Sequence, residues 1–202
     1  GINRSDAASP QSYARIADDV AEQGGRRIGV LAILTAVTVA GAAILQQALQ
    51  PEIATAQKNP LFWVSALLLV LAGASLAALQ RAQLVSAQEL LDLGLVFVVA
   101  GACALSLMEN VVPWPDAPVR GSTIVVTWVA ICLVLIPNRP WKSITAAISS
   151  AVIVPCAHLV AAHVIGYPAL PWNRLLSYSL GLAFVAAWTP FISTRLQRLQ
   201  QD

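Results

Sequence analysis

Six long, mainly apolar stretches run through this chain, and each is close to the length that crosses a lipid bilayer. Between Arg27 and Glu52 there is no charged residue. About 20 helical residues cross about 30 Å of hydrocarbon, where backbone polar groups must pair within the helix. The sequence predicts an all-α integral membrane protein, a six-helix bundle. The expected spans are residues 28–49, 61–80, 90–108, 121–136, 143–166 and 172–193.

The low content of charged residues supports this fold class. Only 11% of the residues are charged, against about 25% in a typical soluble domain, so the chain lacks the charge to cover a water-facing surface. The 12 lysines and arginines form no basic run, which gives no sign of nucleic-acid binding. The partner predicted first is therefore the lipid bilayer.

The fourth stretch is the shortest of the expected spans. Its 16 residues (121–136) would form only about 24 Å of helix, and it is rich in β-branched residues. Snorkelling of Arg120 or local thinning of the bilayer would absorb the deficit. The alternative is a re-entrant segment, which would place the C-terminus on the opposite side of the membrane.

The polar N-terminal segment, residues 1–27, predicts a short amphipathic helix. Ser9 would be its N-cap, with Pro10 at the first helical position. Gly24-Gly25 would end the helix, which would lie on the membrane surface or against a partner; a partly ordered tail is the alternative. Its apolar stripe comprises Tyr13, Ile16, Ala17 and Val20. We expect this segment to be followed by a six-span domain, residues 28–194, and a helical exit, residues 195–202.

Basic residues predict that both termini face the cytoplasm. Cytoplasmic loops carry an excess of Lys and Arg, and six spans place both tails on the same side as the second and fourth loops. The other side holds only Lys58, Arg120 and Arg174. The side with the tails holds Arg4, Arg15, Arg26, Arg27, Arg81, Arg139, Lys142, Arg195 and Arg198.

Ionisable residues within or beside the spans are the first candidates for function. Glu89 and Asp92 stand at the start of the third span, where we expect a helix cap or an ion pair with Arg81. Glu109 and Asn110 stand at the far end of that span. They would face water, bind a ligand or contact a neighbouring loop.

His158 and His163 are the two histidines of the chain, and both lie on the fifth span. Their spacing places them about 140° apart around a helix, so they cannot chelate one metal as an i, i+4 pair can. We expect packed or hydrogen-bonded histidines. The three cysteines lie in apolar stretches and are expected to be small buried residues: Cys103, Cys132 and Cys156.

Enzyme motifs are missing from the sequence. It has neither a G-x-S-x-G nucleophile motif nor a glycine-rich phosphate loop. We therefore predict a protein that is not an enzyme and that binds no metal or cofactor.

Small residues recur at helical spacing within the spans. Such residues let membrane helices approach closely, either inside one chain or between subunits. The predicted packing positions are Ala32, Ala36, Ala40, Gly73, Ala77, Gly94, Gly101, Ser143, Ala147 and Ala151.

Several stretches resemble the membrane region of bacterial transmembrane serine/threonine protein kinases, of the type in which the membrane part precedes the kinase. They are residues 91–97, 104–109 with Pro113-Trp114, 133–142 and 149–155, and residues 195–199 are similar to the linker into the kinase lobe. The resemblance implies a sensor or anchor region in the bacterial inner membrane. Residues for phosphoryl transfer are not among them, so no catalytic residue is carried over.

Three functions follow as hypotheses. The first is a non-catalytic membrane domain that anchors, senses or assembles through helix packing with partners, as in a receptor-type kinase. The second is an accessory structural subunit of a larger photosynthetic or respiratory membrane complex. The third, a small transporter or channel, predicts uptake or conductance that fails when Asp92 or Glu109 is neutralised.

Overall fold

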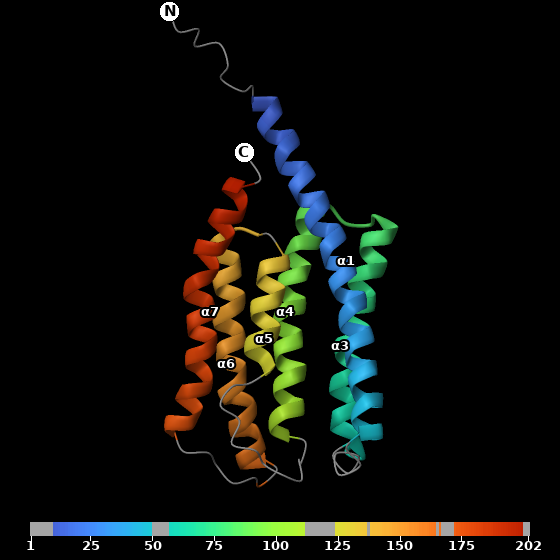
Figure 1. The fold of residues 1–202 in the computed structure, drawn as a ribbon, viewed down its shortest axis with the longest axis vertical. Helices are drawn as coiled ribbons and strands as arrows, with labels where there is room; N and C mark the ends of the chain where they lie inside the picture. Colours follow the sequence, from blue (N-terminus) through green and yellow to red (C-terminus); the bar gives the residue numbers. More distant parts are fainter. Residues whose placement is uncertain are drawn as a thin grey trace, which may run out of the picture.

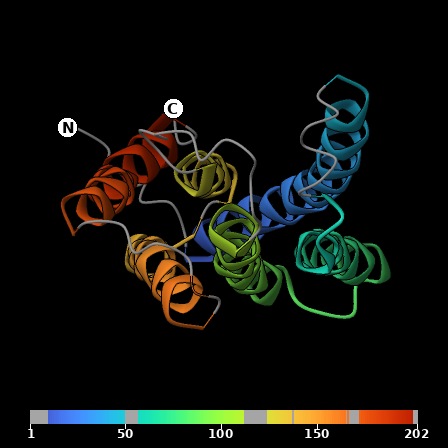
Figure 2. The same ribbon diagram turned by 90° about the horizontal axis from the view of Figure 1, so that it is seen from below.

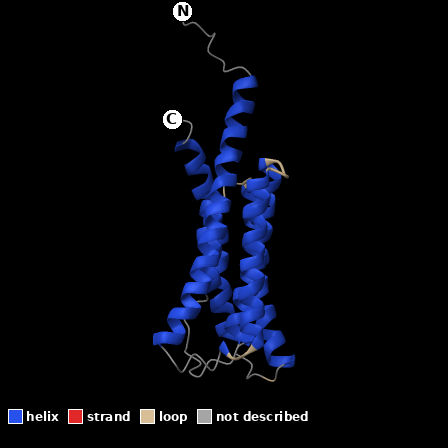
Figure 3. Cartoon of the chain, turned by 90° about the vertical axis from the view of Figure 1, so that its right-hand side faces the viewer, coloured by secondary structure: helices blue, strands red, loops and turns tan. Residues whose placement is uncertain are grey.

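The computed structural model describes residues 10–49, 57–111, 124–136, 138–164, 166 and 172–199. Within these ranges the regular structure is entirely helical, as predicted, and no strand is present (Figure 3). The helices are α1 (Pro10–Leu49), α3 (Pro60–Ala82), α4 (Ala87–Val111), α5 (Ile124–Leu135), α6 (Pro140–Val164) and α7 (Trp172–Leu199).

Four helices contain segments long and apolar enough to cross a membrane. The segments are Gly24–Gly41 of α1, Pro60–Ala82, Ala87–Asn110 and Pro140–His163. Helix α5 and the Leu175–Val185 part of α7 are shorter apolar helices. The chain is therefore an all-α protein with the composition and helix lengths of a membrane protein.

The prediction that Gly24-Gly25 ends a short N-terminal helix is wrong. Helix α1 is continuous from Pro10 to Leu49, so the expected surface helix and the first span form one helix of 40 residues. Both glycines are buried. An ideal Cβ on Gly25 would lie 3.0 Å from Leu90 Cδ2, so this glycine allows close packing of α1 on α4. The expected N-cap, Ser9, lies outside the described residues.

Helix α4 stands at the centre of the bundle, where it contacts α1, α3, α5 and α6. Helix α1 pairs with α3 on one side, and α7 packs on α6 and α5 on the other (Figures 1 and 2). The start of α1 and the end of α7 lie at the same end of the bundle (Figure 1). We call this end, which includes Asp92 and Asn138, the Asp92 end, and the opposite end, with Lys58 and Glu109, the Glu109 end.

Small side chains form much of the buried core. Ala32 of α1 lies against Gly73 of α3, where an ideal Cβ would be 3.1 Å from the Ala32 carbonyl oxygen. Fully buried residues on α4 and α6 include Val98, Ala102, Ser106, Ala147, Ser150 and Ala161. Close approach of this kind gains the van der Waals contact that holds membrane helices together.

Large apolar side chains cover the outside of the bundle. Examples from five helices are Val37, Leu68, Val96, Ile148 and Leu180, each more than half exposed. Monomeric soluble proteins rarely expose contiguous apolar surface on this scale. These side chains are suited to contact lipid acyl chains.

Helix α5 is shorter than the predicted fourth span. Its 12 residues, Ile124–Leu135, form about 18 Å of helix, which falls well short of the roughly 30 Å hydrocarbon core. Residues 121–123, the expected start of this span, lie outside the described residues.

Candidate functional site

A polar cluster at the Asp92 end joins α4 to the start of α6. Both carboxylate oxygens of Asp92 accept hydrogen bonds of 2.6 Å from Lys142 Nζ. Asn138 Nδ2 donates a third bond of 3.1 Å to Asp92 Oδ1. The side chains of Lys142 and Asp92 are 22% and 44% exposed, so the ion pair is partly shielded from solvent.

The residues before α6 position Lys142. The backbone amide of Arg139 donates to Asn138 Oδ1 at 2.7 Å, and the Arg139 carbonyl accepts from the amide of Lys142 at 3.0 Å. Pro140 is the first residue of α6, where its missing N–H costs nothing. This turn places Lys142 in the first turn of α6 with its ammonium on Asp92.

The structure differs from the expectation that Asp92 forms a helix cap or pairs with Arg81. Arg81 is exposed at the end of α3, and the carboxylate of Asp92 instead bonds Lys142, 50 residues away in the chain. Proximity in the sequence favoured Arg81. Folding brings the first turn of α6 closer to Asp92.

Glu89 caps the start of α4 together with Ser86. Its Oε2 accepts from the amide and the hydroxyl of Ser86, each at 2.8 Å, and the Ser86 hydroxyl oxygen accepts from the Glu89 amide at 3.3 Å. This reciprocal pattern is a capping box. Glu89 therefore has a structural role at the N-terminus of α4.

At the Glu109 end, Glu109 and Asn110 bond to different partners. Glu109 Oε1 accepts from the amide of Ile124, the first residue of α5, at 2.8 Å. The side chain of Asn110 donates back to the carbonyl of Ser106, one turn earlier on α4, at 2.8 Å. Glu109 thus ties the start of α5 to α4, as a carboxylate does favourably at a helix N-terminus.

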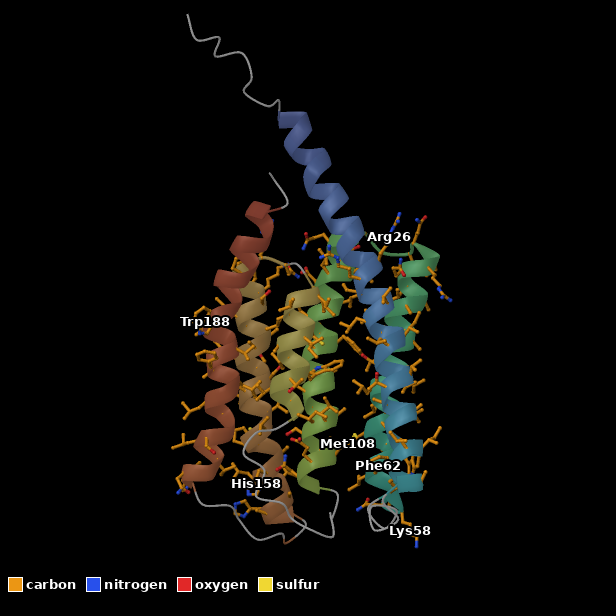
Figure 4. The ribbon with its side chains drawn as sticks, in the orientation of Figure 1. Arg26, Lys58, Phe62, Met108, His158 and Trp188 are labelled. Atoms are coloured by element: carbon orange, nitrogen blue, oxygen red, sulfur yellow. The ribbon has the colours of Figure 1, made fainter. Side chains whose placement is uncertain are left out.

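His158 and His163 differ in their surroundings. His158 is buried, at 6% exposure, and lies in the part of α6 toward the Glu109 end (Figure 4). His163 is exposed near the end of the same helix. Among the described residues, no group of three or more His, Cys, Asp or Glu side chains could hold a metal ion.

The three cysteines do not share one environment, which corrects the expectation that all are buried. Cys132 is fully buried on α5, whereas Cys103 and Cys156 are exposed on the outside of α4 and α6. Apolar neighbours in the sequence predict membrane depth but do not say which side of a helix faces lipid.

The predicted packing positions fall into three groups. Ala40 is exposed, so the described part of the chain does not cover the row of small residues on α1 at that level. Ala36, Ala77 and Ala151 are half-buried. The buried positions are Ala32, Gly73, Gly94, Gly101, Ser143 and Ala147.

Gly101 receives the indole ring of Trp128, a contact that sequence analysis did not identify. An ideal Cβ on Gly101 would lie 2.5 Å from Cε2 and 2.6 Å from Nε1 of that ring. Trp128 Nε1 donates to the carbonyl of Val98 at 2.9 Å, and its ring meets Phe97 edge-on with centroids 5.3 Å apart. The glycine was a signal for close packing, but its partner lies on another helix.

The geometry of both ends indicates structural ties between helices. At the two ends, carboxylates accept hydrogen bonds from backbone amides at helix starts, Asp92 pairs with Lys142, and the Asn138 side-chain amide donates to Asp92. Comparison with protein-family models, with curated proteins and with solved structures finds no match for the chain.

Proposed function

We propose that this chain is a non-catalytic membrane domain with an anchoring or sensing role. Its partners would bind at the Asp92 end through helix packing. The carrying observation is that α1 and α7 both extend beyond the other helices at that end (Figures 1 and 3). In this proposal all six helices are inserted in a bacterial inner membrane, and both chain ends are cytoplasmic.

The ion pair of Asp92 and Lys142 supports the proposal because it links helices that contact the two projecting helices. It joins α4 to α6, and α6 packs on α7, while Leu90 of α4 lies beside Gly25 of α1. A shift of α4 or α6 would therefore reach both projecting helices. Such a connection supports a sensing role, because coupling between distant sites can travel through packed helices and ion pairs.

The resemblance to receptor-type kinases is consistent with this arrangement. Two of the stretches that carry it are residues 91–97, which include Asp92, and residues 133–142, whose Asn138 and Lys142 both donate hydrogen bonds to Asp92. In the proposal, these stretches form one structural unit and the partner is a cytoplasmic effector.

Labelling of the chain ends tests the orientation. We would place single cysteines by Ser5→Cys and Gln201→Cys in a background with Cys103, Cys132 and Cys156 replaced by Ala. A membrane-impermeant maleimide should label both ends in inverted vesicles and neither end in intact cells. Labelling of the two ends from opposite sides would contradict the proposal.

Purification in a mild detergent tests the function. A soluble effector should co-purify with the chain and should be lost when residues 1–23 or 195–202 are removed. Ile148→Ala, on an exposed position of α6, is the matched control and should retain the effector. Retention of the effector by both truncated chains would show that the projecting helices are not its binding site.

A second candidate function is an accessory subunit of a larger membrane complex. The observation in its favour is that Ala40 and Gly41 are exposed on α1, and an ideal Cβ on Gly41 meets nothing within 4 Å. Gly41→Leu should then release the chain from co-migrating membrane subunits, whereas Ala100→Leu on α4 should not. Unchanged co-migration of the Gly41→Leu chain would remove the support from this surface.

A further inference from the structure

Packing contacts near the Asp92 end place parts of α1, α3 and α4 at one level of the bundle. An ideal Cβ on Gly25 of α1 would lie 3.0 Å from Leu90 Cδ2 of α4. One on Gly29 would lie 2.5 Å from Gln80 Oε1 of α3. These contacts fix how far each helix reaches relative to the others.

The end of α5 belongs to the same level. An ideal Cβ on Gly94 of α4 would lie 2.8 Å from Ile28 Cδ1 of α1 and 3.4 Å from Ile136 Cδ1. Ile28 and Ile136 are almost completely buried, at 0% and 1% exposure. Both isoleucines therefore pack against Gly94 in the buried core near the Asp92 end.

Three exposed arginines lie in this level. Arg27 precedes Ile28, Arg81 follows Gln80 at the end of α3, and Arg139 stands three residues after Ile136. We define Arg27, Arg81 and Arg139 as the arginine layer. Because their neighbours in the chain are packed together, the three arginines lie at one end of the bundle and come from three different segments.

The nearby carboxylates do not cancel the charge of the arginine layer. Asp92 is neutralised by Lys142 at 2.6 Å. Glu89 is bonded to the amide and hydroxyl of Ser86 in the cap of α4. Among the side chains that the structure describes at this level, Glu89 is therefore the one carboxylate that remains against the three arginine charges.

Exposed apolar side chains adjoin the arginine layer. Val30 is 65% exposed on α1, Leu84 is 74% exposed after α3, and Trp141 is 60% exposed at the start of α6. Trp is favoured where acyl chains meet headgroups. A phospholipid beside these residues would have its acyl chains on apolar side chains and its phosphate level with the arginines.

We propose that the arginine layer binds the headgroups of anionic phospholipids in the leaflet that surrounds the Asp92 end. Arginine presents a planar fork of donors that matches phosphate geometry. Anionic headgroups attract basic groups beside a membrane. Among the side chains that the structure describes, Lys58 and Glu109 are the charged ones at the Glu109 end, so we expect a preference for anionic lipid to originate at the Asp92 end.

Lipid retention measures this preference directly. The full chain would be purified in a neutral detergent, incubated with mixed phosphatidylglycerol and phosphatidylcholine, and examined by native mass spectrometry for retained lipid. We expect phosphatidylglycerol to be preferred, and each Arg→Gln substitution in the layer to lower the preference by about fivefold, from about 1 kcal/mol per charge. Raising the NaCl concentration should weaken the preference.

Lys58→Gln is the matched control, because it removes one positive charge from the Glu109 end and should leave the preference unchanged. The single variants Arg27→Gln, Arg81→Gln and Arg139→Gln are measured separately, so that the result does not depend on folding of the triple variant. An unchanged preference in all three single variants would overturn the proposal, as would an equal loss in Lys58→Gln. Displacement by inorganic phosphate beyond that by NaCl of equal ionic strength would identify free phosphate as the ligand, against the proposal.

Discussion

Replacing Gly101 by alanine should loosen the contact between α4 and α5. The added Cβ would lie within 2.6 Å of Nε1 of the Trp128 indole, a distance that the ring cannot tolerate. The ring is held by its bond to the Val98 carbonyl and by Phe97. It must therefore move, and the 2.9 Å hydrogen bond must lengthen or break.

The size of the effect follows from three contributions. Overpacking a close contact costs about 1–3 kcal/mol, and losing a hydrogen bond between membrane helices costs about 0.6 kcal/mol. Alanine offsets up to about 1 kcal/mol because it favours helix more than glycine does. We expect a net loss of about 2 kcal/mol in the free energy of unfolding, if the three contributions add.

Cys132 provides the assay, because it is fully buried one turn after Trp128. In a background with Cys103→Ala and Cys156→Ala, the rate at which a thiol reagent modifies Cys132 reports how often the bundle opens. A loss of about 2 kcal/mol should raise this rate by about 30-fold when opening is in rapid equilibrium. Titration with SDS should show unfolding at a lower SDS fraction.

Gly41→Ala is the control, since its Cβ would meet nothing within 4 Å. It should be neutral or slightly stabilising. If Gly101→Ala opened no more often than Gly41→Ala, the tight seating of Trp128 against Gly101 would be refuted as a source of stability.

Two further predictions concern the hydrogen bonds at the two ends. Lys142→Met should lower the free energy of unfolding by up to about 1 kcal/mol, because it removes an ion pair whose Asp92 side chain is 44% exposed; SDS unfolding checks this, and a loss of several kcal/mol would contradict it. Glu109→Ala should cost about 1 kcal/mol, as the loss of an acceptor at a helix start does, and hydrogen exchange at the Ile124 amide should quicken; an unchanged exchange rate would show that this bond does not hold the start of α5.

The helices could be predicted from the sequence because bilayer thickness and uncharged length constrain them strongly. Expected spans 61–80, 90–108 and 143–166 overlap α3, α4 and α6 closely. The error at Gly24-Gly25 has a different cause. A glycine pair signals a helix end locally, but it also permits close packing, and the second use depends on Leu90 from another helix.

The partners of polar residues could not be predicted in the same way. Asp92 has Arg81 nearby in the sequence, yet it bonds Lys142 because α6 packs on α4. Glu109 reaches Ile124, 15 residues later, because α5 begins beside the end of α4. Each outcome depends on which helices become neighbours, and apolar spans of similar length leave many arrangements open.

The continuity of α1 makes its outer part a lever. Residues 10–23 extend beyond Gly24 as a rod of about 21 Å. A tilt of about 10° at the level of Gly25 would carry the tip of this rod sideways by about 4 Å, if the helix stays straight over that length. Small rearrangements where α1 meets Leu90 would thus be magnified well beyond the end of the bundle.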